Sequence, residues 1–116
     1  MPHEDPLHGT RIVLGVCGSI ASYKAADIAS KLTQAGASVD VILTGAAQQF
    51  VTPLTFRGLT LRPVVTDMFD TQSELAEEHV ALASAAGAML IAPASATTIA
   101  RLAHGMADDM VALTAL

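Results

Sequence analysis

An apolar strand that runs into a glycine–serine turn and then into helical spacing constrains the fold of this chain more than any other feature. Residues 11–17 read RIVLGVC, Gly18 and Ser19 follow, and from Ile20 the apolar residues recur at helical intervals until Gly36. A nearly continuous apolar run of this length is typical of a strand buried on both faces of a parallel sheet. The first unit is therefore predicted to be a strand, a turn and a helix that stops at Gly36.

The same alternation of strand and helix continues along the chain. Further strands are predicted at residues 38–43, 61–65 and 88–92, and helices at 44–49, from Pro53, at 77–87, at 97–104 and from Asp108. The polar residues 67–73 are predicted to form a loop. Strands that alternate with helices at this spacing imply βαβ units with right-handed crossovers. We therefore expect a three-layer α/β fold with a mostly parallel sheet flanked by helices.

Composition and charge exclude several classes of function. The chain is 52% hydrophobic and 15% charged, so we expect it to fold, and its net charge of −5 with scattered Lys and Arg offers no surface for a nucleic acid. The longest apolar stretch, residues 80–92, is too short to span a membrane. The single cysteine excludes an internal disulfide, and no histidines have metal-ligand spacing, so we expect no metal site. We expect a cytoplasmic protein with a flexible lead-in at residues 1–10 and one domain at residues 11–116.

Two turns that carry hydroxyl groups follow predicted strands. Gly18 and Ser19 follow the first strand, and Ser95, Thr97 and Thr98 follow the fourth. The carboxyl ends of parallel strands lie at one edge of a sheet, where helix N-termini favour a phosphate. Ordinary helix capping explains either turn equally well, so both interpretations stay open: capping alone, or a mononucleotide such as FMN held between the turns. NAD is disfavoured because the G-x-G-x-x-G spacing is absent and the second strand ends without an acid.

The ionisable residues give weaker signals. His79 follows the polar loop at the start of a predicted helix, where a histidine could transfer protons, but a solvated first-turn histidine explains it better on composition alone. His104 is predicted to interact with a helix C-terminus. Cys17 is predicted to be a small apolar core residue. The acid pairs at residues 77–78 and 108–109 fit the first turns of helices.

Three segments together resemble the homo-oligomeric flavin-containing cysteine decarboxylases. They are GVCGSIASYKAADI (15–28), LTGAAQQFVTPLTF (43–56) and HVALASAAGAMLIAPASATTIARLAHGMADDM (79–110), in the order and spacing of that family. The resemblance extends over residues 11–116. It implies a Rossmann-like (flavodoxin-like) flavoprotein domain that binds FMN and forms homotrimers, or multiples of trimers, with the flavin near a subunit boundary.

The resemblance also implies roles for individual residues. The cofactor-binding residues would be Gly18, Ser19 and Thr44 near the phosphate and ribityl chain, Phe50 beside the ring, and Ser95, Ala96 and Thr97 on the phosphate side. His79 would be the catalytic histidine. In this family, FMN oxidises the thiol side of a cysteine moiety to a thioaldehyde, which then loses carbon dioxide to leave an enethiolate.

The implied reaction is the FMN-dependent decarboxylation of 4'-phosphopantothenoylcysteine to 4'-phosphopantetheine in coenzyme A biosynthesis. Two alternatives remain open: decarboxylation of a peptide's C-terminal cysteine, and a non-catalytic flavin-binding subunit. The sequence departs from the family at Thr97, where many relatives have asparagine. A second departure is that the family's P-x-M-N-x-x-M-W segment and flap cysteine have no counterpart before Leu116. We therefore expect the domain to lack its C-terminal segment and to turn over poorly.

Overall fold

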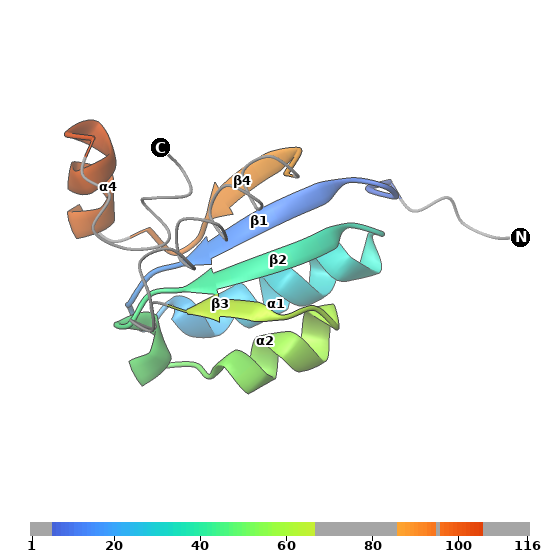
Figure 1. Ribbon diagram of the computed structural model, residues 1–116. Coiled ribbons are helices and arrows are strands. Elements are labelled where there is room, and N and C mark those ends of the chain that lie inside the picture. Colours follow the sequence, from blue (N-terminus) through green and yellow to red (C-terminus); the bar gives the residue numbers. More distant parts are fainter. Residues whose placement is uncertain (1–5, 67–85, 95, 106–116) are drawn as a thin grey trace, which may run out of the picture.

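The computed structural model describes residues 6–66, 86–94 and 96–105 (Figure 1). The elements in chain order are β1 (Arg11–Val16), α1 (Ser22–Gln34), β2 (Ser38–Leu43), the 3₁₀ helix η1 (Ala47–Gln49), α2 (Pro53–Thr60), β3 (Val64–Thr66), β4 (Ala88–Ile91) and α4 (Ala96–Ala103). The helix predicted at residues 77–87 lies outside the described residues up to residue 85, and so does the helix predicted from Asp108.

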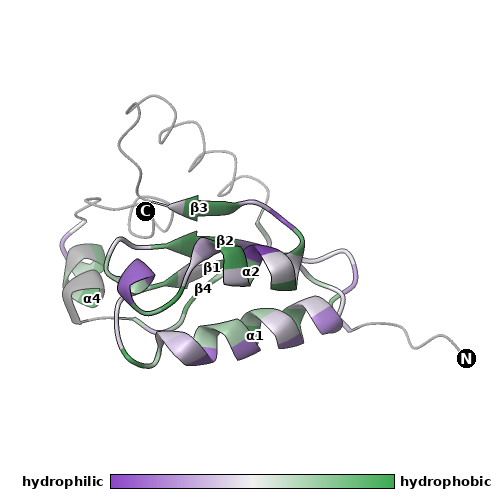
Figure 2. Ribbon diagram, turned by 90° about the horizontal axis from the view of Figure 1, so that it is seen from below, coloured by the Kyte–Doolittle hydropathy of each residue, from purple (hydrophilic) through white to green (hydrophobic). Residues whose placement is uncertain are grey.

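The strands form one parallel sheet in the order β3-β2-β1-β4. β1 pairs along its whole length with β2, and on its other side Ile12 to Gly15 pair with β4. Helices α1 and α2 lie side by side on one face of this sheet (Figures 1 and 2). The predicted α/β fold with a parallel sheet is therefore confirmed.

Side chains alternate between the two faces of the sheet and build two hydrophobic clusters. The face covered by α1 and α2 carries the larger cluster, whose fully buried members include Leu14, Val16, Ala25, Ala29, Val39, Val41, Leu43 and Phe56. The opposite face carries a smaller cluster, which contains Val13, Cys17 and Ile42. Figure 2 shows the hydrophobic colour gathered on the strands and hydrophilic patches along α1. Cys17 is thus a buried core residue, as predicted.

Helix α1 and strand β3 begin later in the sequence than predicted. Helix α1 begins at Ser22 because residues 17–21 form a turn, and this leaves the side chain of Ile20 78% exposed. β3 spans Val64–Thr66 instead of residues 61–65. Leu61 has a left-handed φ of 59° and donates its N–H to the carbonyl of Arg57, 2.9 Å away, so it caps α2 instead of entering the sheet.

Several predicted helix ends are confirmed. Gly36 and Gly105, with φ values of 99° and 69°, follow α1 and α4 at the predicted positions. Thr52 caps α2 by accepting a hydrogen bond from the N–H of Thr55, and Pro53 is the first residue of that helix. The helix predicted at residues 44–49 is shorter and consists of the 3₁₀ turn η1.

The strand predicted at residues 88–92 is present as β4 but is more exposed than a strand buried on both faces. Ala88 and Leu90 are exposed, and Met89 and Ile91 are half-buried. Among the described strands, β4 has a neighbour only on the β1 side.

Part of the predicted lead-in packs on the domain. The N–H of Leu7 donates to the carbonyl of Ala35 at the end of α1, 2.8 Å away, and the Leu7 side chain packs against the larger cluster. The carbonyl of Thr10 accepts a hydrogen bond from Ser38, so this segment leads directly into the β1–β2 pair. Within the described part of the chain, no helix has the length and hydropathy needed to cross a membrane.

Candidate functional site

Three turns meet at the carboxyl edge of the sheet. They follow β1 (residues 17–21), β2 (residues 44–46) and β4 (residues 92–94). The N–H of Thr44 donates to the carbonyl of Val16 and the N–H of Cys17 to that of Pro93, both at 3.1 Å. These bonds continue the parallel ladder beyond the strands and hold the three turns together. The arrowheads in Figure 1 mark this edge.

The turn after β1 is braced by two serine hydroxyls. Ser22 is fully buried, and its Oγ donates to the carbonyl of Cys17 at 2.7 Å and accepts from the N–H of Ser19 at 3.1 Å. Ser19 Oγ accepts from the N–H of Ala21 at 2.9 Å. A hydroxyl that accepts one hydrogen bond still has a hydrogen to donate. Ser19 therefore braces the turn, but it does not cap the helix as one interpretation predicted, because the N-cap of α1 is Ala21 and no side chain bonds there. Its hydroxyl keeps a donor for a ligand.

The turn after β2 is braced by Thr44. Its Oγ1 accepts from the N–H of Ala47 at 3.1 Å, and its carbonyl accepts from the N–H of Gln48 at 3.3 Å. Thr44 is itself buried, whereas Gly45 and Ala46 are exposed. The threonine therefore fixes the backbone of a turn whose outer surface is open.

The turns after β1 and β2 touch at Gly18. A Cβ atom placed on Gly18 would lie 2.4 Å from the Cβ and 2.9 Å from the carbonyl carbon of Ala46. Real Cβ atoms do not approach other carbons so closely, so glycine is required here by the approach of the second turn. The sequence marks Gly18 as a turn residue but gives no signal for its contact with Ala46, which lies 28 positions away.

The donors at this edge suit an anion. Within the described residues, the backbone N–H groups of Gly18, Ile20, Gly45 and Ala46 have no protein acceptor. The three turns contain no Asp or Glu, and no acid lies in the first turn of α1. Unpaired N–H groups beside a helix N-terminus form a favourable environment for a phosphate. The residues present therefore fit the phosphate of a mononucleotide.

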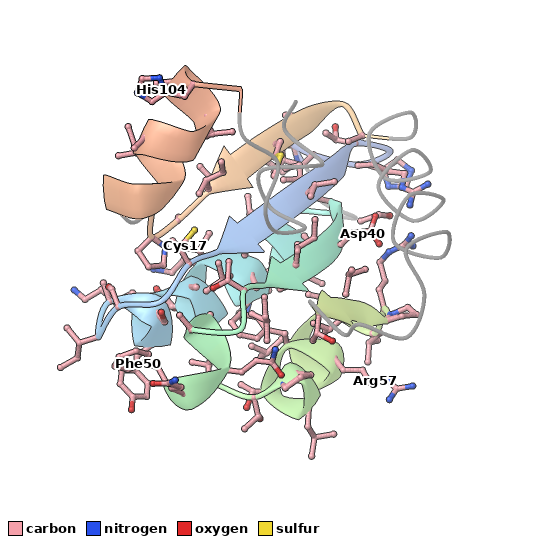
Figure 3. All side chains as sticks on the ribbon, turned by 60° about the vertical axis from the view of Figure 1, so that its left-hand side comes forward. Cys17, Asp40, Phe50, Arg57 and His104 are labelled. Atoms are coloured by element: carbon pink, nitrogen blue, oxygen red, sulfur yellow. The ribbon has the colours of Figure 1, made fainter. Side chains whose placement is uncertain are left out.

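An aromatic pair lies beside these turns. The rings of Tyr23, in the first turn of α1, and Phe50, directly after η1, meet edge to face with centroids 6.4 Å apart and planes at 88°. Figure 3 shows Phe50 at the η1 end of the molecule and Cys17 nearer to α4. Tyr23 is 59% exposed, so the pair presents apolar surface to a ligand at this edge. Phe50 was predicted to lie beside the flavin ring. No role was predicted for Tyr23, because a tyrosine there fits an ordinary helix position.

The remaining predicted site residues are not tested by the structure. His79 and Ser95 lie outside the described residues. Ala96 and Thr97 are the first two residues of α4, so their backbone lies at a helix start beside the β4 turn. His104 follows α4, and the role predicted for its imidazole stays a prediction. Across residues 6–66, 86–94 and 96–105, no three His, Cys, Asp or Glu side chains gather in a way that could hold a metal ion.

A charged cluster lies toward the other end of the sheet. Asp40 of β2 accepts from Nη2 of Arg11 at 2.8 Å and from Nε of Arg62 at 2.7 Å. The Asp40 side chain is only 9% exposed, whereas both arginines are about one-third exposed. Figure 3 shows Asp40 far from Cys17 and the turns. This cluster joins β1, β2 and the entry to β3 and is not part of the candidate site.

Comparisons with known proteins agree on one family. The family model described as Flavoprotein matches residues 1–116. The probable phosphopantothenoylcysteine decarboxylase of Streptococcus mutans is 47% identical over 91% of this chain and 59% of its own length. The coenzyme A biosynthesis bifunctional protein CoaBC of Bacillus subtilis is 46% identical over 95% of this chain and 27% of its own. This chain therefore spans less than two thirds of either relative.

A solved structure gives the same result at the level of the fold. The FMN-dependent cysteine decarboxylase TvaF from thioviridamide biosynthesis matches with a TM-score of 0.84 and 32% sequence identity. The match covers 92% of this chain and 66% of that protein. The predicted Rossmann-like arrangement is therefore shared with a flavin-dependent decarboxylase.

Proposed function

Since this chain belongs to the flavoprotein family, we propose that it is an FMN-dependent decarboxylase. Its reaction is the conversion of 4'-phosphopantothenoylcysteine to 4'-phosphopantetheine in coenzyme A biosynthesis. The observation that carries this proposal is the 47% identity to a probable phosphopantothenoylcysteine decarboxylase over 91% of the chain. The phosphate-compatible donors at the carboxyl edge of the sheet support it independently.

The cofactor is held by the turns after β1 and β2. The unpaired N–H groups at this edge and the hydroxyls of Ser19 and Thr44 bind the phosphate and the ribityl chain, and Phe50 contacts the ring. Ser95, Ala96 and Thr97 complete the phosphate side. Bound FMN supplies a two-electron oxidant for the thiol-bearing carbon of the substrate, which creates the electron sink that a simple cysteine carboxylate lacks. The protein holds the substrate thiol in place and excludes competing orientations.

His79 is the proton-transfer residue in this proposal. Histidine changes its charge near neutral pH and can therefore give and take protons under cellular conditions. The support is the position of His79 at the start of the segment that resembles the flavin-containing cysteine decarboxylases. Its role is separate from cofactor binding, which the turns provide.

A second candidate is decarboxylation of a C-terminal cysteine in a peptide. The observation that favours it is the match to TvaF, an FMN-dependent cysteine decarboxylase, with a TM-score of 0.84. Both candidates use the same fold and cofactor. They differ only in what is attached to the cysteine.

We also propose that the protein acts in the cytoplasm as a homotrimer or a multiple of trimers. The support is the exposed apolar surface formed by large side chains on several described elements. They are Ile20, Tyr23, Leu54, Leu61, Leu90 and Ile99. Exposed large apolar side chains are common at subunit contacts.

Product analysis with two substrates tests the proposed reaction. FMN-loaded protein is incubated with 4'-phosphopantothenoylcysteine or with a peptide ending in cysteine, and carbon dioxide release and the thiol product are measured. We expect more release with the first substrate than with the second, with slow turnover by this chain in both cases. Replacement His79→Asn is expected to reduce release by about 100-fold or more while FMN stays bound, because general acid–base catalysis contributes about 10²–10⁴-fold. Release from the peptide alone would favour the second candidate, and loss of FMN in His79→Asn would assign His79 to binding.

A further inference from the structure

Ala46 occupies a position that the proposed reaction leaves without a role. It is exposed, carries no polar side-chain atom and lies between Gly45 and η1 in the turn after β2. Its Cβ nevertheless lies directly against Gly18 in the turn after β1, with no room for even one added carbon between them. The two turns that carry the phosphate-compatible donors are therefore in contact at their tips.

Each of these turns is held by hydrogen bonds of its own. The turn after β1 is held by Ser22, whose hydroxyl bonds Cys17 and Ser19. The turn after β2 is held by Thr44, whose hydroxyl caps the N–H of Ala47. The hydrogen bond from Thr44 to Val16 joins the turns at their base. The relative position of their tips has one further determinant among the described residues, the contact of Ala46 with Gly18.

We propose that Ala46 is a positioning residue for the cofactor phosphate: its contact with Gly18 sets the spacing between the donor groups of the two turns. This inference rests on the proposed FMN cofactor and adds a residue to that site. The unpaired N–H groups lie on both sides of the contact, on Gly18 and Ile20 of one turn and on Gly45 and Ala46 of the other. A phosphate that bridges the turns needs both sets at a fixed separation, and an added or removed carbon at the contact changes that separation.

Removal of the Ala46 methyl group tests this role. Ala46→Gly is expected to weaken FMN binding about tenfold, the loss of roughly one hydrogen bond to a charged group. Riboflavin lacks the phosphate, so its affinity is expected to stay unchanged. Ala46→Ser keeps the Cβ atom and is expected to bind FMN like the wild type. Ala35→Gly makes the same chemical change at the far end of α1 and is the control for general loss of stability. Affinities are measured by titration calorimetry and folding by circular dichroism.

A second pair of variants examines the contact itself. Gly18→Ala places a carbon against Ala46 and is expected to abolish tight FMN binding. Addition of Ala46→Gly to Gly18→Ala removes the closest clash, so the double variant is expected to recover part of the affinity. The test is whether the double variant binds FMN more tightly than Gly18→Ala alone. It therefore does not require Gly18→Ala to be as stable as the wild type.

The outcomes separate this inference from the proposed function. Wild-type protein that binds FMN, together with an Ala46→Gly variant that binds it equally well, overturns the role of Ala46 and leaves the cofactor in place. Equal loss of FMN and riboflavin in Ala46→Gly also overturns it, because a role in phosphate spacing must distinguish the two ligands. Wild-type protein that binds no FMN contradicts the proposed cofactor and, with it, this inference.

Discussion

Among the described residues, Asp40 is a buried acid that pairs with two arginines. Its buried carboxylate accepts from Arg11 on one oxygen and from Arg62 on the other, and so ties β1 to the segment before β3. A buried charge that loses its partners is costly, whereas an exposed pair contributes little. The chain offers the exposed counterpart in Asp27, which pairs with Lys31 one helical turn later at 2.9 Å.

We expect Asp40→Asn to lower the free energy of unfolding by about 1–3 kcal/mol, because both arginines lose their charged partner while remaining partly buried. Asp27→Asn is the matched control and should change it by less than about 0.5 kcal/mol. Urea denaturation of both variants measures the difference. Equal changes in the free energy of unfolding would mean that the buried ion pairs of Asp40 stabilise the fold no more than the exposed pair of Asp27.

Residues at the site differ in how far the sequence predicts them. Gly18 and Ser19 were singled out because they follow a strand and belong to residue types that turns and caps require, whereas the site role of Thr44 was implied by the resemblance. Ala46 and Ser22 were missed. Their importance comes from contacts, with Gly18 and with the carbonyl of Cys17, that an alanine or a serine in a helical pattern does not signal.

At the scale of the elements, local periodicity predicted β1, α1 and β2 well and β3 poorly. The β1–α1–β2 unit is specified by an apolar run, helical spacing and a stop glycine, all of which are local. The start of β3 depends on Leu61, which closes α2 in a left-handed conformation, and on Arg62, which reaches Asp40 22 positions earlier. Leu61 was predicted to begin the strand, and the contact of Arg62 with Asp40 could not be seen in the local pattern.

The left-handed Leu61 gives a prediction for helix α2. A leucine in this conformation is strained by its Cβ, and its side chain is 85% exposed, so little packing would be lost. Leu61→Gly is therefore expected to raise the free energy of unfolding by about 1 kcal/mol. Leu54 belongs to the same helix and is 76% exposed, but its position is helical. Leu54→Gly is expected to lower stability by about 0.5 kcal/mol. Thermal and urea unfolding measure the stability change of each variant. Changes of the same sign in Leu61→Gly and Leu54→Gly would contradict the strain at Leu61.

At the scale of the whole molecule, the parallel sheet accounts for both the fold and the position of the site. Parallel strands all end at one edge, so turns that are far apart in sequence meet there without any special arrangement. The sequence therefore predicted which turns meet at this edge, and ligand binding there stays a prediction. The exposure of β4 and of several large apolar side chains was not predicted, because the pattern of residues 88–92 is that of a strand covered on both faces.

Self-assembly is the prediction that concerns the whole molecule. Three copies of an 11.9 kDa chain have a mass of about 36 kDa. We expect light scattering at micromolar concentration, with FMN present, to give this mass or a multiple of it, because exposed leucine, isoleucine and tyrosine side chains favour subunit contacts. A mass near that of one chain at every concentration would contradict the trimer.

The register of β1 also bears on how the chain is made. Arg11 pairs with Ser38, 27 residues later, whereas Ile12 pairs with Ala88, 76 residues later. Ribosomes add about 5–20 residues per second, so synthesis of residues 44–91 takes about 2–10 s. For that time the nascent chain can form its first βαβ unit, but the strand that covers the outer edge of β1 has not yet been made. An apolar strand edge without its partner can pair with other chains, so the period of greatest aggregation risk ends only with the synthesis of β4.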